Sequence, residues 1–344
     1  MLSIDVIFFT IVLVFFFNFV LNKNNILLDQ PEAEIHKSRI SKKKVPISLG
    51  IVLSILCAYL LIQNHSYINL FVILIFFVGL LSDIRYLHSP GKRIILQSLV
   101  IFAYLVFSDN LIYDTRIMII NELLNNNLFS LVFTLFCITI LINGTNFTDG
   151  INTLVIGYYL IVLLSIALVS NSLGEQLENV FIVKFIPILI IFFIFNALGK
   201  SFLGDGGSYA LSFMVGIYLI DLSNFDYQIS PWFVALLLWY PAFENLFSII
   251  RRQRYSFKLS KADTLHIHHL IFLFLKRKIK YGHLSVNFMT SFLINVFNAA
   301  TILLGSLFYN DTQSLVLLVS FNILIYVYTY IYLSNYFEKY KSKK

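Results

Sequence analysis

The sequence predicts an all-α polytopic integral membrane protein with about eleven transmembrane helices. Hydrophobic residues make up 58% of the chain and charged residues only 12%, about half the charged fraction usual in a water-soluble domain. Long apolar stretches recur along the chain and lack the alternation of a membrane β-strand, so each is expected to be a helix. The expected spans are 4–21, 46–63, 67–82, 94–108, 128–142, 154–170, 180–197, 208–221, 231–250, 286–308 and 314–335.

Lysine and arginine residues fall almost entirely on one side of this topology. Of the 25, only Arg116 and Lys184 would lie on the other side. Cytoplasmic loops retain basic residues, so the N-terminus is expected outside and the C-terminus inside. The same rule explains the net charge of +7 without a nucleic-acid partner. No cation precedes the first apolar run and Lys23 follows it, which favours a permanent helix over a cleaved signal peptide.

The chain is expected to form a single membrane-embedded domain, residues 1–344. Its expected cytoplasmic loops are 22–45, 83–93, 143–153, 199–207 and 251–285. The first polar cluster is Asp83, at the inner end of the third span, with Lys92 and Arg93 about two helical turns further on. A solvated loop with snorkelling cations would also account for Lys92 and Arg93. Asp83 is the candidate site residue of this cluster, because other polar clusters share its side of the membrane.

The second cluster contains Asn143, Asn146, Asp149 and Asn152. Residues three apart share one face of a helix, if the segment is helical. Four polar groups between two apolar spans are costly unless they line a wet site. A simple polar turn would be richer in charge and would not keep this spacing.

The third cluster is the glycine-rich segment from Gly199 to Ser208, with Lys200 and Asp205 inside it. Glycines let the backbone approach a phosphate closely, and the amide groups at a helix start favour anions. An aspartate there suggests a metal ion that joins the phosphates, since Mg²⁺ commonly takes one or two carboxylates and phosphate oxygens for the rest. Asp205 is the candidate metal ligand of this segment.

The fourth cluster lies in the longest inner loop and combines a basic run with three histidines. Only His266 and His269 would share a helical face, and no cysteine or third ligand lies near them in the sequence, so zinc is disfavoured. Anion binding by imidazoles and basic residues is the better interpretation. The candidates of this cluster are Arg251, Arg252, His266, His268 and His269, although topology alone would explain the two arginines.

Together the clusters indicate a metal-assisted reaction on a phosphorylated substrate at the inner membrane face. The carboxylates of Asp83, Asp149 and Asp205 are surrounded by cations and glycine loops. A metal ion held there would neutralise phosphate charge in the transition state, and the cations would bind the remaining oxygens.

At these residues the chain resembles the polyprenyl-phosphate N-acetylhexosamine-1-phosphate transferases, bacterial enzymes that initiate O-antigen, enterobacterial common antigen and teichoic acid linkage units. Four segments carry the resemblance, and they fall in family order across about residues 29–270: GLLSDIRYLHSPGKR, NGTNFTDGINTL, FLGDGGSYALSF and RRQRYSFKLSKADTLHIHHL. A weaker match in the first inner loop comprises Asp29, Pro31, His36, Lys37, Pro46 and Gly50.

The resemblance implies an eleven-helix catalytic domain in the bacterial plasma membrane, with its active site on the cytoplasmic face. It implies Mg²⁺ or Mn²⁺, a UDP-linked N-acetyl sugar (N-acetylglucosamine by default) and undecaprenyl phosphate as acceptor, with a homodimer left open. Asp83, Asp149 and Asp205 match the family's catalytic aspartates, Asn143 and Asn146 its paired asparagines, and the three histidines its nucleotide-sugar motif. Substrate binding is expected to involve Lys92, Arg93, Asn143, Asn146, Asn152, Lys200, Arg251, Arg252, His266, His268 and His269.

Three residues depart from the family pattern. Ser82 stands where the first aspartate of a pair is usual, Asn152 where many members have an aspartate, and Glu244 where an aspartate is common. Loss of the carboxylate at Ser82 is tolerable in principle, since a phosphate monoester has a second pKa near 6 and is ionised without a base. The resulting hypothesis is direct attack by the lipid phosphate, with Asp83 helping to position it, Asp205 as leading metal ligand and Asp149 holding metal or nucleotide.

Alternative functions remain open at this point. Within the family, phospho-MurNAc-pentapeptide transfer is the main alternative. Outside it, a membrane transporter or flippase would also have many helices and basic loops, but transporters usually hold ionisable residues near the midplane. Only Glu244 is a clear example here. Ser82 also leaves open a catalytically inactive family member.

Overall fold

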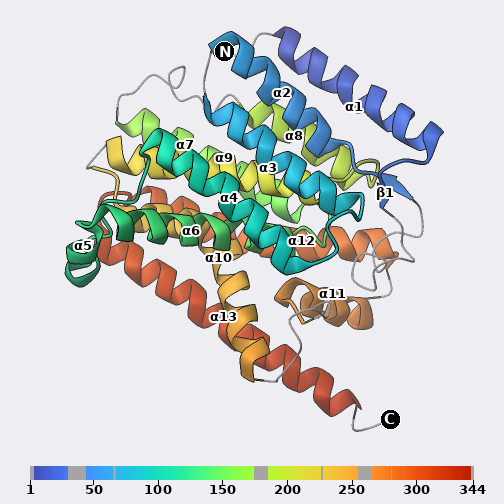
Figure 1. Ribbon diagram of the computed structural model, residues 1–344. Coiled ribbons are helices and arrows are strands. Elements are labelled where there is room, and N and C mark those ends of the chain that lie inside the picture. Colours follow the sequence, from blue (N-terminus) through green and yellow to red (C-terminus); the bar gives the residue numbers. More distant parts are fainter. Residues whose placement is uncertain are drawn as a thin grey trace.

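The computed structural model describes residues 4–29, 44–64, 67–173, 185–225, 228–254, 265–279 and 281–341. Within them the chain is all-α apart from one short antiparallel pair of strands, β1 (Leu28–Asp29) and β2 (Val45–Pro46) (Figure 1). The helices are α1 (Ile4–Asn24), α2 (Leu49–Asn64), α3 (Tyr67–Asp83), α4 (Pro90–Ser108), α5 (Met118–Leu124), α6 (Asn127–Thr148), α7 (Leu154–Ser172), α8 (Ile186–Ala197), α9 (Gly204–Phe225), α10 (Pro231–Arg254), α11 (Ile267–Lys278), α12 (His283–Ser306) and α13 (Thr312–Lys341).

The chain is a multi-pass membrane protein, as the sequence predicts. Each of the eleven expected spans coincides with a helix. Among the described residues, seven helices are long and apolar enough to cross a membrane, and α2, α3 and α8 are shorter apolar helices. The remaining expected span corresponds to α9, which begins with Gly204 and Asp205, and these residues lower its apolar character. The number of crossings and the orientation stay predictions.

Several expected loops are shorter than predicted because helices extend into them. Pro90 starts α4 four residues before the expected span, since proline fits the first helical turn, where its missing N–H is no loss. Helix α6 continues to Thr148, and α9 begins at Gly204. The expected loop 251–285 contains α11. The candidate residues therefore lie mostly on helix ends and not in loops.

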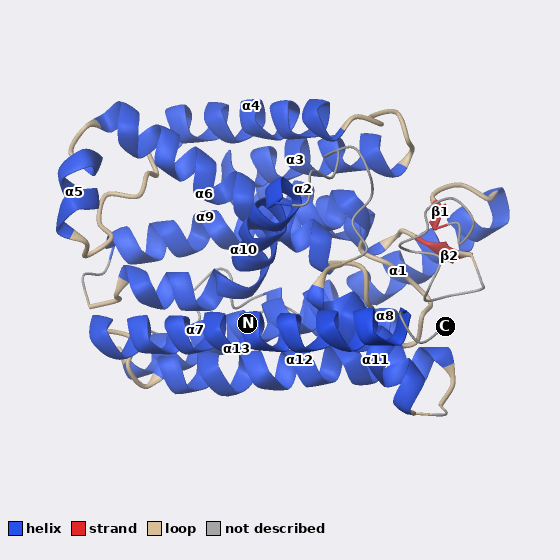
Figure 2. Ribbon diagram, turned by 90° about the horizontal axis from the view of Figure 1, so that it is seen from below, coloured by secondary structure: helices blue, strands red, loops and turns tan. Residues whose placement is uncertain are grey.

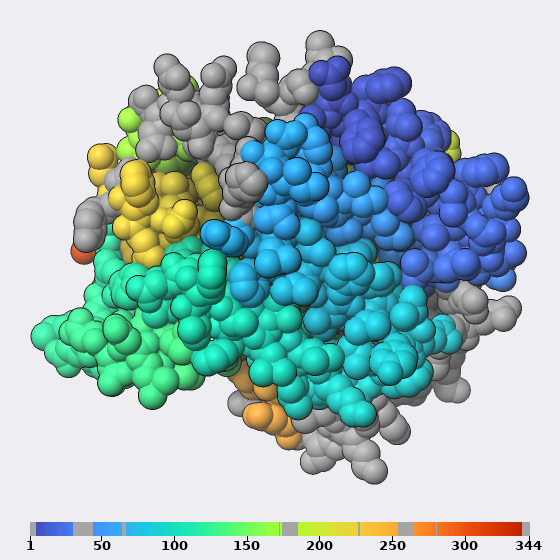
Figure 3. Space-filling view, turned by 45° about the horizontal axis from the view of Figure 1, so that its top comes forward, coloured from blue at the N-terminus to red at the C-terminus, as the bar shows by residue number. Residues whose placement is uncertain are grey.

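Large apolar side chains cover much of the outer surface. On α1, Phe8, Phe15 and Phe19 are all more than half exposed, as are Leu317 and Leu324 on α13. Figure 3 shows α1, in dark blue, at the edge of the face formed with α2 and α3. In water such a surface would promote association, whereas in a bilayer these side chains face lipid.

Glycines let α9 pack closely against α2 and α3. A Cβ on Gly79 of α3 would lie 2.4 Å from the Cα of Gly206, and a Cβ on Gly50 of α2 would lie 2.7 Å from the backbone N of Gly207. Helix pairs in membranes associate through small residues of this kind, since backbones can then approach each other. The start of α9 is thereby fixed between two neighbouring helices.

Helix α10 contains Pro241, which cannot donate a hydrogen bond to the carbonyl four residues earlier. That carbonyl, of Leu237, accepts a hydrogen bond of 2.8 Å from the hydroxyl of Tyr158 instead. Beyond the proline, the C-terminal part of α10 turns away from the bundle (Figure 1). The proline thus directs the residues after it toward α11 and α13.

The two strands and α11 lie at one end of the molecule and α5 lies at the other (Figure 2). Arg116, expected on the side away from the polar clusters, precedes α5. It donates hydrogen bonds to Asn310, between α12 and α13, and to Thr312, the first residue of α13. The opposite end contains the C-terminus of α3 and the N-termini of α4 and α9, where the predicted site residues lie.

Candidate active site

Asp83 binds the first turn of α9. Its Oδ1 accepts a hydrogen bond from the backbone N–H of Asp205 and its Oδ2 one from the N–H of Gly206, both at 3.0 Å. The start of a helix has unpaired N–H groups and a partial positive charge, so a carboxylate is stabilised there. The sequence predicts an anion at this helix start, and the anion that the structure places there is Asp83.

Gly204 leaves the space that this arrangement needs. Its φ of +75° lies in the left-handed region, and a Cβ on it would lie 2.9 Å from Oδ2 of Asp83. Any other residue would therefore strain the backbone and crowd the carboxylate. The glycine-rich segment serves the contact between α3 and α9 as well as any ligand.

Asp205 is the meeting point of side chains from three other helices. Its Oδ1 accepts a hydrogen bond of 2.8 Å from Asn146 of α6, and its Oδ2 accepts one of 2.7 Å from the hydroxyl of Ser82 of α3. Arg93 of α4 lies 3.3 Å from the same Oδ2 and donates to Ser82 at 2.9 Å. Asp205 is only 7% exposed, so each of these bonds is only weakly screened by water.

A polar cavity of about 430 Å³ opens beside this group. Its lining includes Ser82, Asp83 and Asp205 together with residues 25–29 and Ile47. Hydrogen bonds from Phe202 to Pro46 and from Leu49 to Phe202 join the β2 segment to the residues before α9. Asp29 of the weaker motif match therefore lies at the cavity, whereas Pro31, His36 and Lys37 lie outside the described residues.

Other residues of the predicted set have structural contacts. Asn143 donates hydrogen bonds to Gln97 of α4 and to the carbonyl of Thr139. Asn152 donates to the carbonyl of Asn196, at the end of α8. The side chains of Lys92 and Lys200 are exposed, and that of Arg252 on α10 is half-buried.

Residues 265–269, called the histidine segment below, pack against the C-terminal end of α6. The ring of His266 lies 5.1 Å from that of Phe147, and a Cβ on Gly150 would lie 3.1 Å from Nε2 of His268. This contact places the histidines beside Asp149, which caps α6. Burial and the neighbouring rings of His269 and His266 hold the pKa of His268 well below its usual range. His268 is therefore a neutral imidazole at pH 7.

Asp205 and its neighbours Ser82 and Asn146 carry side-chain oxygen atoms, the type of ligand that Mg²⁺ and Mn²⁺ prefer. Arg93, 3.3 Å from Asp205, carries no ligand atom for a metal ion. No three His, Cys, Asp or Glu side chains in the described ranges are close enough to form a complete metal site. Mg²⁺ often binds through one or two carboxylates, with substrate phosphates completing its shell.

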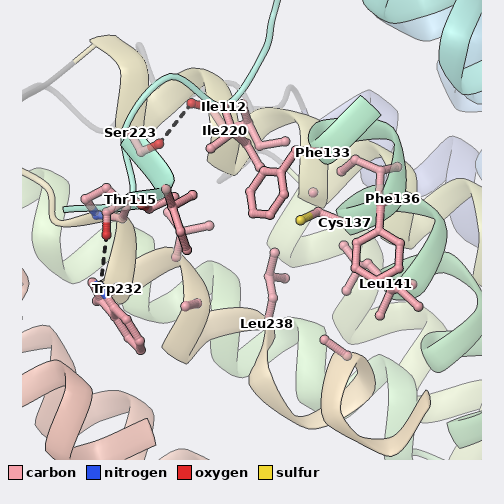
Figure 4. A pocket seen from close by; sticks show the side chains of 18 of the residues that line it. Ile112, Thr115, Phe133, Phe136, Cys137, Leu141, Ile220, Ser223, Trp232 and Leu238 are labelled. Carbon is pink, nitrogen blue, oxygen red and sulfur yellow. Dashed lines mark hydrogen bonds between the residues drawn. The ribbon is translucent and has the colours of Figure 1, made fainter. Parts of the chain in front are cut away.

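A second cavity, of about 350 Å³, is almost entirely apolar and lies between α6, α9 and α10. Figure 4 shows Phe133, Phe136 and Cys137 of α6 on one side and Leu238 of α10 on the other. Gly216 of α9 also lines it. Eleven residues separate Gly216 from Asp205, which corresponds to about 16 Å along the helix.

Asp83 and Asp205 with the side chains bonded around them form the aspartate cluster. Two side chains at this cluster were not predicted. Ser82 was recognised only as a missing carboxylate, yet its hydroxyl binds Asp205 and accepts from Arg93. Gln97 follows Arg93 by one helical turn and binds Asn143, and a glutamine inside an apolar run was the signal that could have revealed it.

Comparisons with known proteins give a matching family model and several similar proteins. Residues 65–223 match the model of glycosyl transferase family 4. The chain is 27% identical over 253 residues to a Bacillus subtilis protein named as a probable undecaprenyl-phosphate N-acetylglucosaminyl 1-phosphate transferase. It is 26% identical over 211 residues to the Escherichia coli undecaprenyl-phosphate α-N-acetylglucosaminyl 1-phosphate transferase, and 27% over 203 residues to a Clostridium perfringens phospho-N-acetylmuramoyl-pentapeptide-transferase. These similarities agree with the family that the motifs predict.

The family match includes the aspartate cluster but not the histidine segment, which lies beyond residue 223. The matches cover 72%, 57% and 54% of this chain, and 70%, 54% and 64% of the Bacillus, Escherichia and Clostridium proteins. Transferases that act on different sugars are thus similar to this chain at nearly equal identity.

Proposed function

We propose that this protein transfers an N-acetylhexosamine 1-phosphate group, with N-acetylglucosamine as the first candidate sugar, from a UDP-linked donor to undecaprenyl phosphate, releasing UMP. The observation that carries the proposal is the nearly buried carboxylate of Asp205, bonded by Asn146, Ser82 and Arg93 at the edge of a polar cavity. The names of the Bacillus and Escherichia relatives support the reaction class.

The proposed reaction is a direct displacement at phosphorus. An oxygen of the acceptor phosphate attacks the β-phosphorus of the donor, the new P–O bond forms, and the bond to the departing UMP breaks. The acceptor phosphate is largely ionised at pH 7, so the absence of a carboxylate at Ser82 removes no necessary base. A Mg²⁺ or Mn²⁺ ion held by Asp205, with Asp149 as second carboxylate, would neutralise phosphate charge.

The residues around Asp205 would have separate roles in binding phosphate and in positioning Asp205. Arg93 provides a fixed cation next to Asp205, and exposed Lys92 adds positive charge at the same helix start, so both favour binding of phosphate. Asp83 holds the first turn of α9, and through it Asp205, in place. The contact with the α9 backbone therefore favours a positioning role for Asp83 over direct contact with the acceptor.

The lipid acceptor is consistent with the apolar cavity. Helices α6 and α9 contribute Asn146 and Asp205 at one end and line the cavity further along. A polyprenyl chain attached to a phosphate at Asp205 would reach this cavity without leaving the surface of the two helices. The reaction would then be the first membrane step of a cell-surface polysaccharide, at the cytoplasmic face of a bacterial plasma membrane.

Phospho-MurNAc-pentapeptide transfer is the second candidate, because a relative of that kind is as similar as the Bacillus protein. Both reactions release UMP and differ only in the donor. A panel that contains UDP-N-acetylglucosamine, other UDP-N-acetyl sugars and UDP-muramoyl-pentapeptide separates them.

The test incubates membranes containing the full chain with each donor, undecaprenyl phosphate and Mg²⁺, and identifies the nucleotide released. We expect UMP together with a pyrophosphate-linked lipid sugar, and loss of both in Asp205→Asn. Release of UDP would mean ordinary glycosyl transfer and would overturn the mechanism. Absence of product with every donor would favour an inactive homologue or a transporter.

A further inference from the structure

The last helix, α13, is bonded to the histidine segment through one buried carboxylate. Glu244 of α10 is 0% exposed. Its Oε1 lies 2.8 Å from Nδ1 of His266, and its Oε2 accepts a hydrogen bond of 2.8 Å from the hydroxyl of Tyr326 on α13. Each oxygen of this buried carboxylate thus has a partner, which a buried charge needs in order to be tolerated.

Arg251 of α10 makes a second connection to the same segment. Its guanidinium donates to the carbonyl of Leu265, directly before His266, and to the hydroxyl of Tyr330 at 3.0 Å. The guanidinium also lies 5.5 Å from the centre of the Tyr330 ring. Tyr326 and Tyr330 are four residues apart on α13, so they present one helical face to α10.

The histidine segment also packs against the C-terminal end of α6. His266 and His268 stack with ring centres 5.6 Å apart, and Gly150 and Phe147 of the α6 end lie against them. Neither ring nitrogen of His268 has a hydrogen-bond partner among the described residues. Directional bonds join the segment to Glu244, Ser248 and Arg251 on α10.

We propose that Glu244, Arg251, Tyr326 and Tyr330 form a positioning network through which α13 holds the histidine segment against the end of α6. The inference deepens the proposed function and rests on it in one respect, namely that the histidine segment binds the nucleotide part of the donor. The last helix then determines donor affinity although it lies outside the region that matches the family model.

Tyr326→Phe tests the network because it removes only the hydroxyl that binds Glu244. The matched control is Tyr240→Phe, which removes a buried hydroxyl that has no hydrogen-bond partner in the described part of the chain. With the full-length protein in lipid nanodiscs, we expect Tyr326→Phe to raise the KM for the UDP-sugar about three- to tenfold, as for loss of one typical hydrogen bond. The KM for undecaprenyl phosphate is expected to stay within about twofold in both variants.

Hydrogen–deuterium exchange of the same proteins without substrate gives a readout that does not depend on activity. Tyr326→Phe is expected to speed exchange in residues 265–272 and to leave residues 204–212 unchanged. Faster exchange in both segments would mean general destabilisation and would overturn the proposal, as would equal changes of both KM values or none. If the wild-type protein uses no UDP-sugar at all, the proposed function fails, and the exchange comparison still decides whether α13 positions the segment.

Discussion

The aspartate cluster at the start of α9 and the histidine segment are held in place in different ways. At the start of α9, backbone groups make the decisive contacts, because Asp83 binds two N–H groups and glycines bring α2, α3 and α9 together. At the histidine segment, side chains make them, through Glu244 and Arg251. The first region lies inside the family match and the second outside it.

This difference suggests how each region tolerates change. A backbone contact between glycines allows almost no substitution, since any added Cβ meets another main chain. A side-chain network changes one bond at a time, so donor preference can vary without loss of the fold. Relatives with different sugar donors would then be expected to differ more at the second region than at the first.

The largest effect is expected for Asp83→Asn. The amide offers one acceptor in place of two and directs an NH₂ group at the backbone N–H donors, so the first turn of α9 loses its cap. We expect the free energy of unfolding to fall by about 1–2 kcal/mol. UMP release is expected to fall about a hundredfold, because Asp205 moves relative to its partners.

The matched control is Asp221→Asn, on the same helix but toward its other end. It is expected to leave both quantities close to wild type. Full activity in Asp83→Asn would show that the contact with α9 does not position Asp205. A complete loss of activity with unchanged stability would instead support direct contact of Asp83 with a substrate, the role predicted from the sequence.

The next effect concerns the glycine contact between α3 and α9. Gly79→Ala places a methyl group against the backbone of Gly206, and overpacking of this kind costs about 1–3 kcal/mol of unfolding free energy. Thermal unfolding in detergent measures the loss. Gly91→Ala is the control, because the nearest atom to its added Cβ is Oγ of Ser89 at 3.8 Å. Equal stability of the two variants would contradict the close approach of these helices.

The sequence predicted the helices well and their ends less well. Each apolar run is long, so its hydropathy identifies a helix wherever it begins. The polar ends carry no such signal, and so Arg93 and Asn146 were assigned to expected loops, whereas both lie on helices. Helix α11 was missed for a related reason, since a short helix outside the membrane need not be continuously apolar.

Site membership was easier to predict than site geometry. Motif spacing marked Asp83 and Asp205, but it could not show that one caps the helix that carries the other, because that contact joins residues 122 apart in sequence. Asn143 and Asn146 have the same residue type and lie one turn apart, yet one binds Gln97 and the other Asp205. Such differences depend on tertiary packing.

A smaller effect is expected at Ser82. Ser82→Ala removes one donor from Asp205 and one acceptor from Arg93, so UMP release is expected to fall about three- to tenfold. Ser82→Thr keeps the hydroxyl and should retain most of the activity. Ser82→Asp introduces the carboxylate usual in the family and places it next to the like charge of Asp205. A large rate gain in that variant would show that the missing carboxylate limits the reaction.

The smallest effect separates the two faces of α10. Leu238, Ala242 and Leu246, spaced by four residues, line the apolar cavity, whereas Glu244 and Arg251 bind the histidine segment. Ala242→Trp fills part of the cavity and is expected to raise the KM for undecaprenyl phosphate about two- to fivefold, a cost of under about 1 kcal/mol. The KM for a short-chain polyprenyl phosphate and for the UDP-sugar should not change. If Tyr326→Phe acts on the donor alone and Ala242→Trp on the long acceptor alone, α10 separates the two substrates, because its opposite faces belong to different sites. Equal effects of Ala242→Trp on short and long acceptors would place the lipid chain elsewhere.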